Sequence, residues 1–188
     1  TVSTATGDGF RHATYREVGK QAARLANALR KLGIDGDQRV ATFMWNNQEH
    51  LEAYVAVPSM GAVLHTLNIR LFPEQIEFVA YEAEDQIVIA DVSLIPILAP
   101  VLPRMETVHT VIAVGDGDIS ALEASGKTVL RYHDITAAES DHFEWPDVDE
   151  NSAAAMCYTS GTTGHPKGVV YGHRSSYLHS MAVCSGNG

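Results

Sequence analysis

The chain has 188 residues, of which 45% are hydrophobic, and this suffices to build the core of one domain or of part of a larger one. Its formal net charge is −10, from 13 basic and 23 acidic side chains, and no basic face is evident, which argues against a nucleic-acid-binding protein. The most apolar run, 87–102, is broken by Asp91, Pro96 and Pro100 and therefore predicts no transmembrane segment.

The ends and the cysteines of the chain bear on its location. The first nine residues are polar and contain no signal peptide, and the two cysteines are too few for a disulfide framework. Their spacing also suits no metal site. We therefore expect a cytoplasmic protein. Because the chain starts with Thr1 and not with Met, we expect that it begins inside something longer or was processed.

Strands and helices are predicted to alternate over residues 14–114. Residues 10–13 form a short strand in this prediction. Thr14 and Glu17 then form a capping box for a helix that ends at Gly33. Further strands are predicted at 39–44, 62–66, 86–90 and 110–114. One helix is predicted from Asn46 or Asn47 to about Gly61, and another from Pro73 to about Ala83. A third helix, interrupted by prolines, starts at Asp91 or Ser93. This alternation predicts an α/β fold with a mostly parallel, doubly wound sheet flanked by helices.

Residues 115–150 carry weaker signals. A turn at 115–118 is followed by a predicted short helix and a strand near 128–131. Residues 134–150 include seven acidic residues and no Lys or Arg. We interpret this segment as an exposed acidic connector, since a solvated surface explains its charge better than a metal site does.

A polar, glycine-rich stretch follows, Tyr158-Thr159-Ser160-Gly161-Thr162-Thr163-Gly164-His165-Pro166-Lys167-Gly168. Apolar, β-prone residues flank it, so residues 153–172 are predicted to form a strand, a loop and a second strand. Glycines let a backbone approach a ligand closely, and successive exposed N–H groups can hold an anion. Lys167 adds a mobile positive charge suited to phosphate. The stretch therefore predicts a phosphate-binding loop.

The spacing of this loop excludes two common phosphate-binding motifs. In the Walker A motif the lysine follows a glycine directly and precedes Ser or Thr, whereas here the order is Pro166-Lys167-Gly168. A P-loop NTPase is therefore disfavoured, and the Rossmann fingerprint fails as well. At every fixed position the stretch matches the signature [YF]-T-[ST]-G-[ST]-T-G-x-P-K-G, and in this it resembles the adenylate-forming (AMP-binding) enzymes.

Weaker likenesses to the same superfamily cover nearly the whole chain. They lie at 14–18, at 36–41 with Gln38 as a departure, and at 61–71. His65-Thr66 and residues 169–174 resemble the medium- and long-chain fatty acyl-CoA synthetases in particular. Family members are longer and have two domains. The resemblance thus implies that residues 1–188 are a partial N-terminal AMP-binding domain, with an alternating core at 14–114, the connector at 134–150 and the strand–loop–strand unit at 153–172.

The resemblance also implies a reaction. Such enzymes join a carboxylate to ATP with release of pyrophosphate, and coenzyme A then displaces AMP from the acyl-adenylate. Lys167 would be catalytic by neutralising the departing pyrophosphate, and Mg²⁺ would bridge phosphate oxygens with Thr159 closest to the metal. The implied nucleotide-binding residues are Thr159, Ser160, Gly161, Thr162, Thr163, Gly164 and Lys167.

Other interpretations stay open. The acid could be an aryl or amino acid in place of a fatty acid, or the chain could be a non-catalytic phosphate-binding module. We expect the 188 residues alone to be inactive. Apolar sheet edges favour self-association, and a homodimer is among the expected forms.

Single residues near the loop carry their own expectations. A last helix is predicted from His173 to about Val183, and His173 and Arg174 lie either near the nucleotide or a subunit contact, or at an exposed helix start. His65 is expected to be packed or hydrogen-bonded rather than catalytic, and Cys157 to be a buried, inert thiol.

Overall fold

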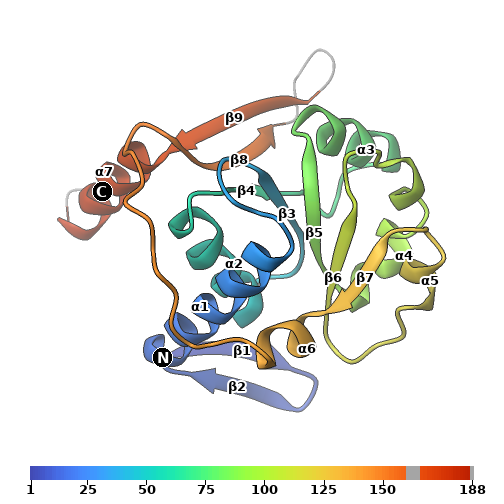
Figure 1. The fold of residues 1–188 in the computed structure, drawn as a ribbon, viewed down its shortest axis with the longest axis horizontal. Helices are drawn as coiled ribbons and strands as arrows, with labels where there is room; N and C mark the ends of the chain where they lie inside the picture. Colours follow the sequence, from blue (N-terminus) through green and yellow to red (C-terminus); the bar gives the residue numbers. More distant parts are fainter. Residues whose placement is uncertain (160–165, 187–188) are drawn as a thin grey trace.

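The structure, a computed structural model, describes residues 1–159 and 166–186. Its centre is a seven-stranded sheet in the order β7-β6-β5-β3-β4-β8-β9, and β1 and β2 form a separate two-stranded sheet (Figure 1). The strands are β1 (Val2–Thr6), β2 (Gly9–Ala13), β3 (Arg39–Phe43), β4 (Val63–Thr66), β5 (Asp85–Asp91), β6 (Thr110–Val114), β7 (Thr128–Arg131), β8 (Ala153–Thr159) and β9 (Lys167–Gly172). The α-helices are α1 (Tyr15–Lys31), α2 (Gln48–Ser59), α3 (Pro73–Glu82), α4 (Ile95–Leu98), α5 (Ser120–Glu123), α6 (Tyr132–Ala137) and α7 (His173–Cys184).

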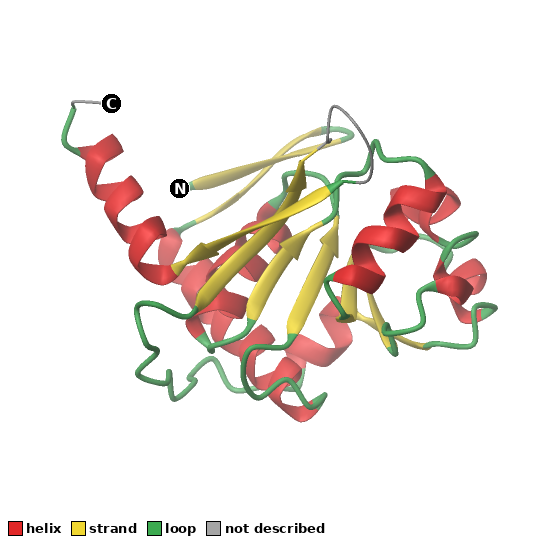
Figure 2. Cartoon of the chain, turned by 90° about the horizontal axis from the view of Figure 1, so that it is seen from above, coloured by secondary structure: helices red, strands yellow, loops and turns green. Residues whose placement is uncertain are grey.

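The predicted fold class is confirmed. Every neighbouring pair in the large sheet from β7 to β8 is parallel, and the β8–β9 pair at its edge is antiparallel. The order β4-β3-β5-β6-β7 is that of a flavodoxin-like sheet, in which the chain first moves to one side of its first parallel strand and then to the other. The connecting helices therefore fall on both faces of the sheet (Figure 2).

Two apolar cores lie on the two faces of the sheet. Successive residues of a strand point to opposite faces, so that Ile87 and Ile89 of β5 enter one core while Val88 and Ala90 enter the other. Helices α1, α2 and α6 pack on the first face, and α3, α4 and α5 on the second. Burial on both faces explains why these strands are continuous runs of Val, Ile and Ala.

Local end signals place the helices as predicted. The hydroxyl of Thr14 accepts from the Glu17 N–H at 3.2 Å and the Glu17 carboxylate accepts from the Thr14 N–H at 2.7 Å. Gly33 follows the end of α1 with φ +94°, a conformation that favours glycine. Asn47, and not Asn46, caps α2 through the His50 N–H at 2.9 Å.

The structure adds one strand that was not predicted and shows how the proline-interrupted helix is divided. Strand β1 was not predicted, because residues 1–9 are polar and only Thr4 of this strand is buried. The helix predicted from Asp91 or Ser93 is broken into the 3₁₀ turn η1 (Val92–Leu94), the four-residue α4 and the 3₁₀ turn η2 (Leu102–Arg104). Prolines at 96, 100 and 103 remove donors and prevent one continuous helix.

The acidic segment 134–150 is not simply an exposed connector. It begins inside α6, and its Phe143 is only 7% exposed and packs into the core with the Arg30 guanidinium 5.7 Å from its ring centroid. The amide of Asn27 on α1 donates to two of its carbonyl groups. The burial of Phe143 was not predicted, because the residues around it are mainly acidic. Phe143 anchors the segment against α1.

Candidate functional site

Two strands flank the glycine-rich stretch, as predicted, and the structure shows that they pair antiparallel as a hairpin. Strand β8 leads into it and β9 leads out, with Thr159 directly opposite Lys167. Because β8 runs parallel to β4, its last residue Thr159 and the opposite Lys167 lie at the edge where the parallel strands have their carboxyl ends (Figure 1). In open α/β sheets this edge is where ligands bind.

The described part of the chain includes two of the predicted binding residues. Thr159 and Lys167 are both exposed, and none of the ion pairs between described residues includes Lys167. The Lys167 ammonium is therefore available to a phosphate. The remaining predicted residues, Ser160, Gly161, Thr162, Thr163 and Gly164, lie outside the described residues.

Tyr158 and Gly168 form the next cross-strand pair below the tip. A Cβ at position 168 would lie 3.1 Å from Cζ of Tyr158 and 3.3 Å from its hydroxyl oxygen, so the tyrosine ring occupies the space beside the glycine. Burial, with the Glu82 carboxylate as a further cause, raises the pKa of Tyr158 to about 12. The Tyr158 hydroxyl therefore stays protonated over the physiological pH range.

Replacing Gly168 with alanine is expected to lower the free energy of unfolding by about 1–3 kcal/mol, because the new methyl group overpacks against Tyr158. Urea unfolding measures the change. Gly19→Ala is the matched control: Gly19 lies inside α1, and a methyl group added there would meet no atom within 4 Å, so this substitution should stabilise the helix by about 0.5–1 kcal/mol. Adding Tyr158→Leu to Gly168→Ala should restore most of the loss, and equal costs with and without the tyrosine would contradict the contact.

A buried imidazole–carboxylate pair lies beside Tyr158. Nδ1 of His65 is 2.9 and 2.8 Å from the two carboxylate oxygens of Asp85, and both side chains are fully buried. Burial raises the pKa of Asp85, and the hydrogen bond with His65 opposes that rise. The expectation that His65 is packed and hydrogen-bonded is confirmed.

Two further expectations concern residues near the hairpin, and for the pair His173 and Arg174 both interpretations stay open, because Arg174 is exposed whereas His173 is half-buried. Cys157 is half-buried and interacts with the Tyr171 hydroxyl, so the prediction of a buried thiol was wrong, because β8 lies beside an edge strand. Arg174 is exposed and pairs with Glu150 at 2.6 Å. Its backbone N–H also donates to the Glu150 carbonyl at 2.8 Å, so the start of α7 is tied to the end of the acidic segment.

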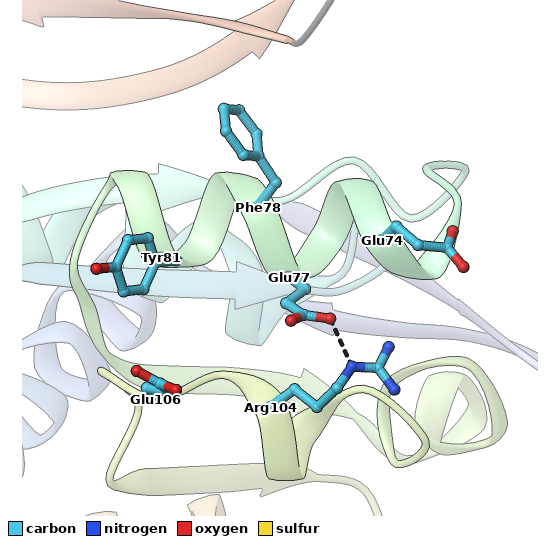
Figure 3. Close-up of a pocket in the computed structure, with 6 residues that line it drawn as sticks. All are labelled: Glu74, Glu77, Phe78, Tyr81, Arg104 and Glu106. Atoms are coloured by element: carbon cyan, nitrogen blue, oxygen red, sulfur yellow. Dashed lines mark hydrogen bonds and ion pairs between the residues drawn. The ribbon is translucent and has the colours of Figure 1, made fainter.

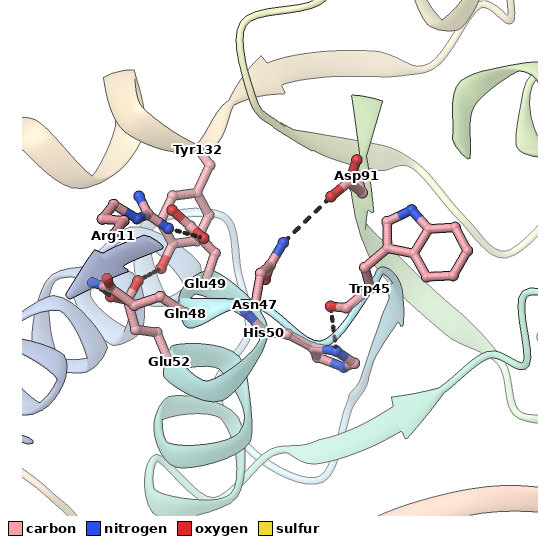
Figure 4. A network of polar contacts seen from close by, with 9 residues as sticks. All are labelled: Arg11, Trp45, Asn47, Gln48, Glu49, His50, Glu52, Asp91 and Tyr132. Atoms are coloured by element: carbon pink, nitrogen blue, oxygen red, sulfur yellow. Dashed lines mark hydrogen bonds and ion pairs between the residues drawn. The ribbon is translucent and has the colours of Figure 1, made fainter. Parts of the chain in front are cut away.

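A polar network at the carboxyl edge of the sheet was not predicted from the sequence. It joins β2, α2 and α6 (Figure 4), and beside it lies a cleft of about 400 Å³. The Tyr132 hydroxyl donates to Glu52 at 2.6 Å, the Gln48 amide donates to Glu52 at 2.7 Å, and Arg11 pairs with Glu49 at 2.7 Å. Glu52 occupies a position of α2 that faces the core, and a glutamate at such a position is the sequence signal that predicts a buried polar network.

Changing Glu52 to glutamine tests the electrostatics of this network. Burial raises the pKa of Glu52 in the folded protein, so the folded state binds the proton more tightly and stability falls as pH rises from the unfolded pKa to the folded one. The glutamine variant lacks this loss and should therefore gain stability relative to wild type at pH 7 but not at acidic pH. Thermal unfolding across pH measures it.

Tyr132→Phe provides the companion measurement. It removes a donor that lowers the pKa of Glu52, so the loss of stability with rising pH should become larger. Tyr15→Phe, at a side chain that is 72% exposed, is the matched control and should change the unfolding free energy by no more than about 0.5 kcal/mol. A glutamine variant with the pH profile of wild type would refute the burial cost.

A second hollow lies on the outer side of α3 (Figure 3) and has a volume of about 560 Å³. Glu74, Glu77 and Glu106 contribute three carboxylates to it, and its guanidinium, from Arg104, is already paired with Glu77 at 2.5 Å. This charge repels phosphate, so the hollow does not compete with the hairpin as a nucleotide site.

Metal clusters and membrane-spanning helices are both absent from the described residues. Within 1–159 and 166–186, no group of three or more His, Cys, Asp or Glu side chains could hold a metal ion. In the same part of the chain no helix has the length and apolar character needed to cross a membrane.

Comparisons with known proteins agree on one family. The family model described as "AMP-binding enzyme" matches residues 2–187. A medium-chain-fatty-acid–CoA ligase of Ectopseudomonas oleovorans is 43% identical over 97% of this chain and 33% of its own length. A 3-methylmercaptopropionyl-CoA ligase of Ruegeria pomeroyi is 42% identical over 95% of this chain and 33% of its own length.

A solved structure shares the fold. The anthranilate CoA ligase AuaEII, in complex with anthranoyl-AMP, matches 96% of this chain and 33% of its own with a TM-score of 0.85 at 21% identity. The chain spans about a third of the length of the curated relatives it matches.

Proposed function

The chain belongs to the AMP-binding enzyme family, and from that premise we propose that it is part of an ATP-dependent, AMP-forming acyl-CoA ligase that activates a medium- or long-chain fatty acid. The observation that carries the proposal is the β8–β9 hairpin at the carboxyl edge of the sheet, where exposed Lys167 stands opposite Thr159. The fatty-acid substrate is supported by the name of the relative from Ectopseudomonas oleovorans.

The proposed reaction has two steps. A carboxylate oxygen of the fatty acid attacks the α-phosphorus of ATP, the bond from that phosphorus to the bridging oxygen breaks, and pyrophosphate leaves. The thiol of coenzyme A then adds to the acyl carbonyl, loses its proton, and AMP leaves with the electrons of the broken acyl–oxygen bond. In the first step negative charge grows on the departing pyrophosphate, so positive charge and N–H donors near it lower the barrier.

The hairpin tip supplies groups of this kind. We propose that Lys167 neutralises the pyrophosphate, and that the loop residues Ser160, Gly161, Thr162, Thr163 and Gly164 bind the β- and γ-phosphates. Lys167 is the first residue of β9, so its backbone is held by the ladder to β8 while its side chain reaches into solvent. This arrangement positions the charge without burying it.

Mg²⁺ fits the same site as a substrate-bound ion. Magnesium usually keeps several waters and takes few protein ligands besides phosphate oxygens. Thr159 is exposed at the end of β8 and offers one hydroxyl oxygen to the ion. Among the described residues, no cluster of acidic side chains provides another set of protein ligands for Mg²⁺. We propose that Thr159 is the residue nearest to this ion, which would supply positive charge on the phosphate oxygens.

Exchange of labelled pyrophosphate into ATP tests the proposal, with the full-length protein and a panel of fatty, aryl and amino acids. Exchange that depends on fatty acids supports it. Exchange stimulated only by amino or aryl acids would assign a different substrate, as in the anthranilate CoA ligase that shares the fold. ATP hydrolysis without any carboxylate would point to another class of enzyme.

The 188 residues alone are expected to produce no acyl-adenylate, because the chain spans about a third of its relatives' length. The alternative function, a non-catalytic phosphate-binding module, applies to this state. Mass spectrometry of a reaction with ATP and a fatty acid measures the product, with the full-length protein as positive control. Detectable acyl-adenylate from the 188 residues would refute the expectation.

Location and assembly are further proposals. A cytoplasmic location is supported by the two free cysteines, Cys157 and Cys184. A homodimer is supported by apolar side chains on β9 and α7 that are exposed in the described chain: Val169, Val170, Tyr171, Tyr177, Leu178, Met181 and Val183.

A further inference from the structure

A buried polar contact crosses the middle of the sheet below the candidate site. His65 lies on β4 and Asp85 starts β5, and β3 runs between these two strands. Ala41 of β3 pairs with His65 in register, and directly paired residues of neighbouring strands share a face. The small Ala41 side chain leaves room for the imidazole to reach Asp85 over β3.

The same imidazole contacts the strand that leads to the phosphate loop. The ring centroids of His65 and Tyr158 are 5.2 Å apart with planes inclined by 49°. Tyr158 in turn occupies the space beside Gly168 of β9. Thr159 and Lys167, the next pair, stand at the tip. An unbroken series of contacts therefore links the buried carboxylate to the two ends of the loop.

The His65–Asp85 pair contributes little to stability, because burying polar groups removes their contacts with water. A buried ion or dipole pair can often be replaced by apolar side chains without loss of stability, so the main effect of this pair is to orient the imidazole. Nε2 of His65 is buried and has no hydrogen-bond partner among the described residues. The Asp85 carboxylate is thus the polar group that sets the orientation of the ring.

We propose that His65 and Asp85 are positioning residues for the phosphate loop. Asp85 orients the imidazole, the imidazole supports the Tyr158 ring, and that ring holds β9 at the register which places Lys167 opposite Thr159. This inference rests on the proposed function, because it assigns the pair a part in binding the phosphates of ATP.

The test compares two double variants of the full-length protein. His65→Leu/Asp85→Leu removes the polar pair and the ring, and His65→Phe/Asp85→Leu removes the polar pair but keeps an aromatic ring against Tyr158. Ile112→Val, at a fully buried position of β6, is the control for a general change in the core. Hydrogen exchange is followed in 153–159 and 167–172 and, as reference, in 15–31.

In the Leu/Leu variant, hydrogen exchange in the hairpin strands is expected to be about tenfold faster than in wild type, with the reference segment unchanged. Its KM for ATP should be about tenfold higher, with a smaller change in the KM for the fatty acid. The Phe/Leu variant should recover part of both effects. Asp85→Asn, which keeps one hydrogen bond to His65, serves if a double variant does not fold, and its effects should be intermediate.

Unchanged hairpin exchange would overturn the inference, and so would faster exchange with an unchanged KM for ATP, since the pair would then serve stability alone. Failure of the proposed function is distinguishable. If the wild-type protein exchanges no pyrophosphate with any acid, the catalytic assignment falls, whereas the hydrogen-exchange measurement still decides whether the pair orders the hairpin.

Discussion

Replacing Lys167 with alanine in the full-length protein is expected to slow acyl-adenylate formation by about 100-fold, within the range found when one group that stabilises transition-state charge is removed. The side chain is exposed, has no ion-pair partner in the described chain, and starts the strand that leaves the loop. Its charge is therefore free to meet the negative charge that grows on the pyrophosphate, and its loss should affect the first step more than the transfer to coenzyme A.

Rapid-quench measurement of acyl-adenylate in the absence of coenzyme A isolates that first step. Lys31→Ala is the matched control, because it removes the same charge from a lysine that is 69% exposed and that pairs with Glu139 on the face of the sheet opposite α3. That variant should retain the wild-type rate. An unchanged rate in Lys167→Ala would exclude the proposed role.

Changing Phe43 to alanine is expected to lower the free energy of unfolding by about 3–5 kcal/mol. Phe43 ends β3 and is fully buried in the core under α3 and α4, where the missing ring would leave a cavity. Because β3 is the strand between the two halves of the sheet, the loss should be felt by the whole sheet.

Urea unfolding provides the measurement, and Phe10→Ala provides the control at a side chain that is 68% exposed, with an expected change of no more than about 0.5 kcal/mol. Equal effects at the two positions would mean that the ring of Phe43 is not part of a close-packed core. A changed slope of the unfolding curve would instead indicate an altered unfolded state.

Much of the fold was predictable because its signals are local. The Thr14–Glu17 capping box, the glycine after α1 and the alternating strands of the sheet each depend on residues within a few positions of one another. The strands β8 and β9 were predicted in the same way, from two apolar runs around a glycine-rich stretch, whereas their antiparallel pairing was not. The phosphate-binding roles of that stretch stay a prediction.

The missed features share a different property. Strand β1 is polar and is stabilised by its partner β2, and Phe143 is a single anchor in an acidic segment. Neither has a periodic pattern of its own. Each became visible only when the partner surface was known. The interruption of the helix after β5, by contrast, was predicted, because prolines are a local signal.

The sequence by itself determined the α/β class, the alternation of strands and helices over residues 14–114 and the likeness of the loop to the AMP-binding enzymes. Only the tertiary structure showed that His65 meets Asp85 20 residues away and that Glu52 meets Tyr132 80 residues away. The physical reason is that helix caps and strand periodicity act within one turn or one strand. Contacts between distant residues depend on strand order and register, which the packing of both faces of the sheet decides.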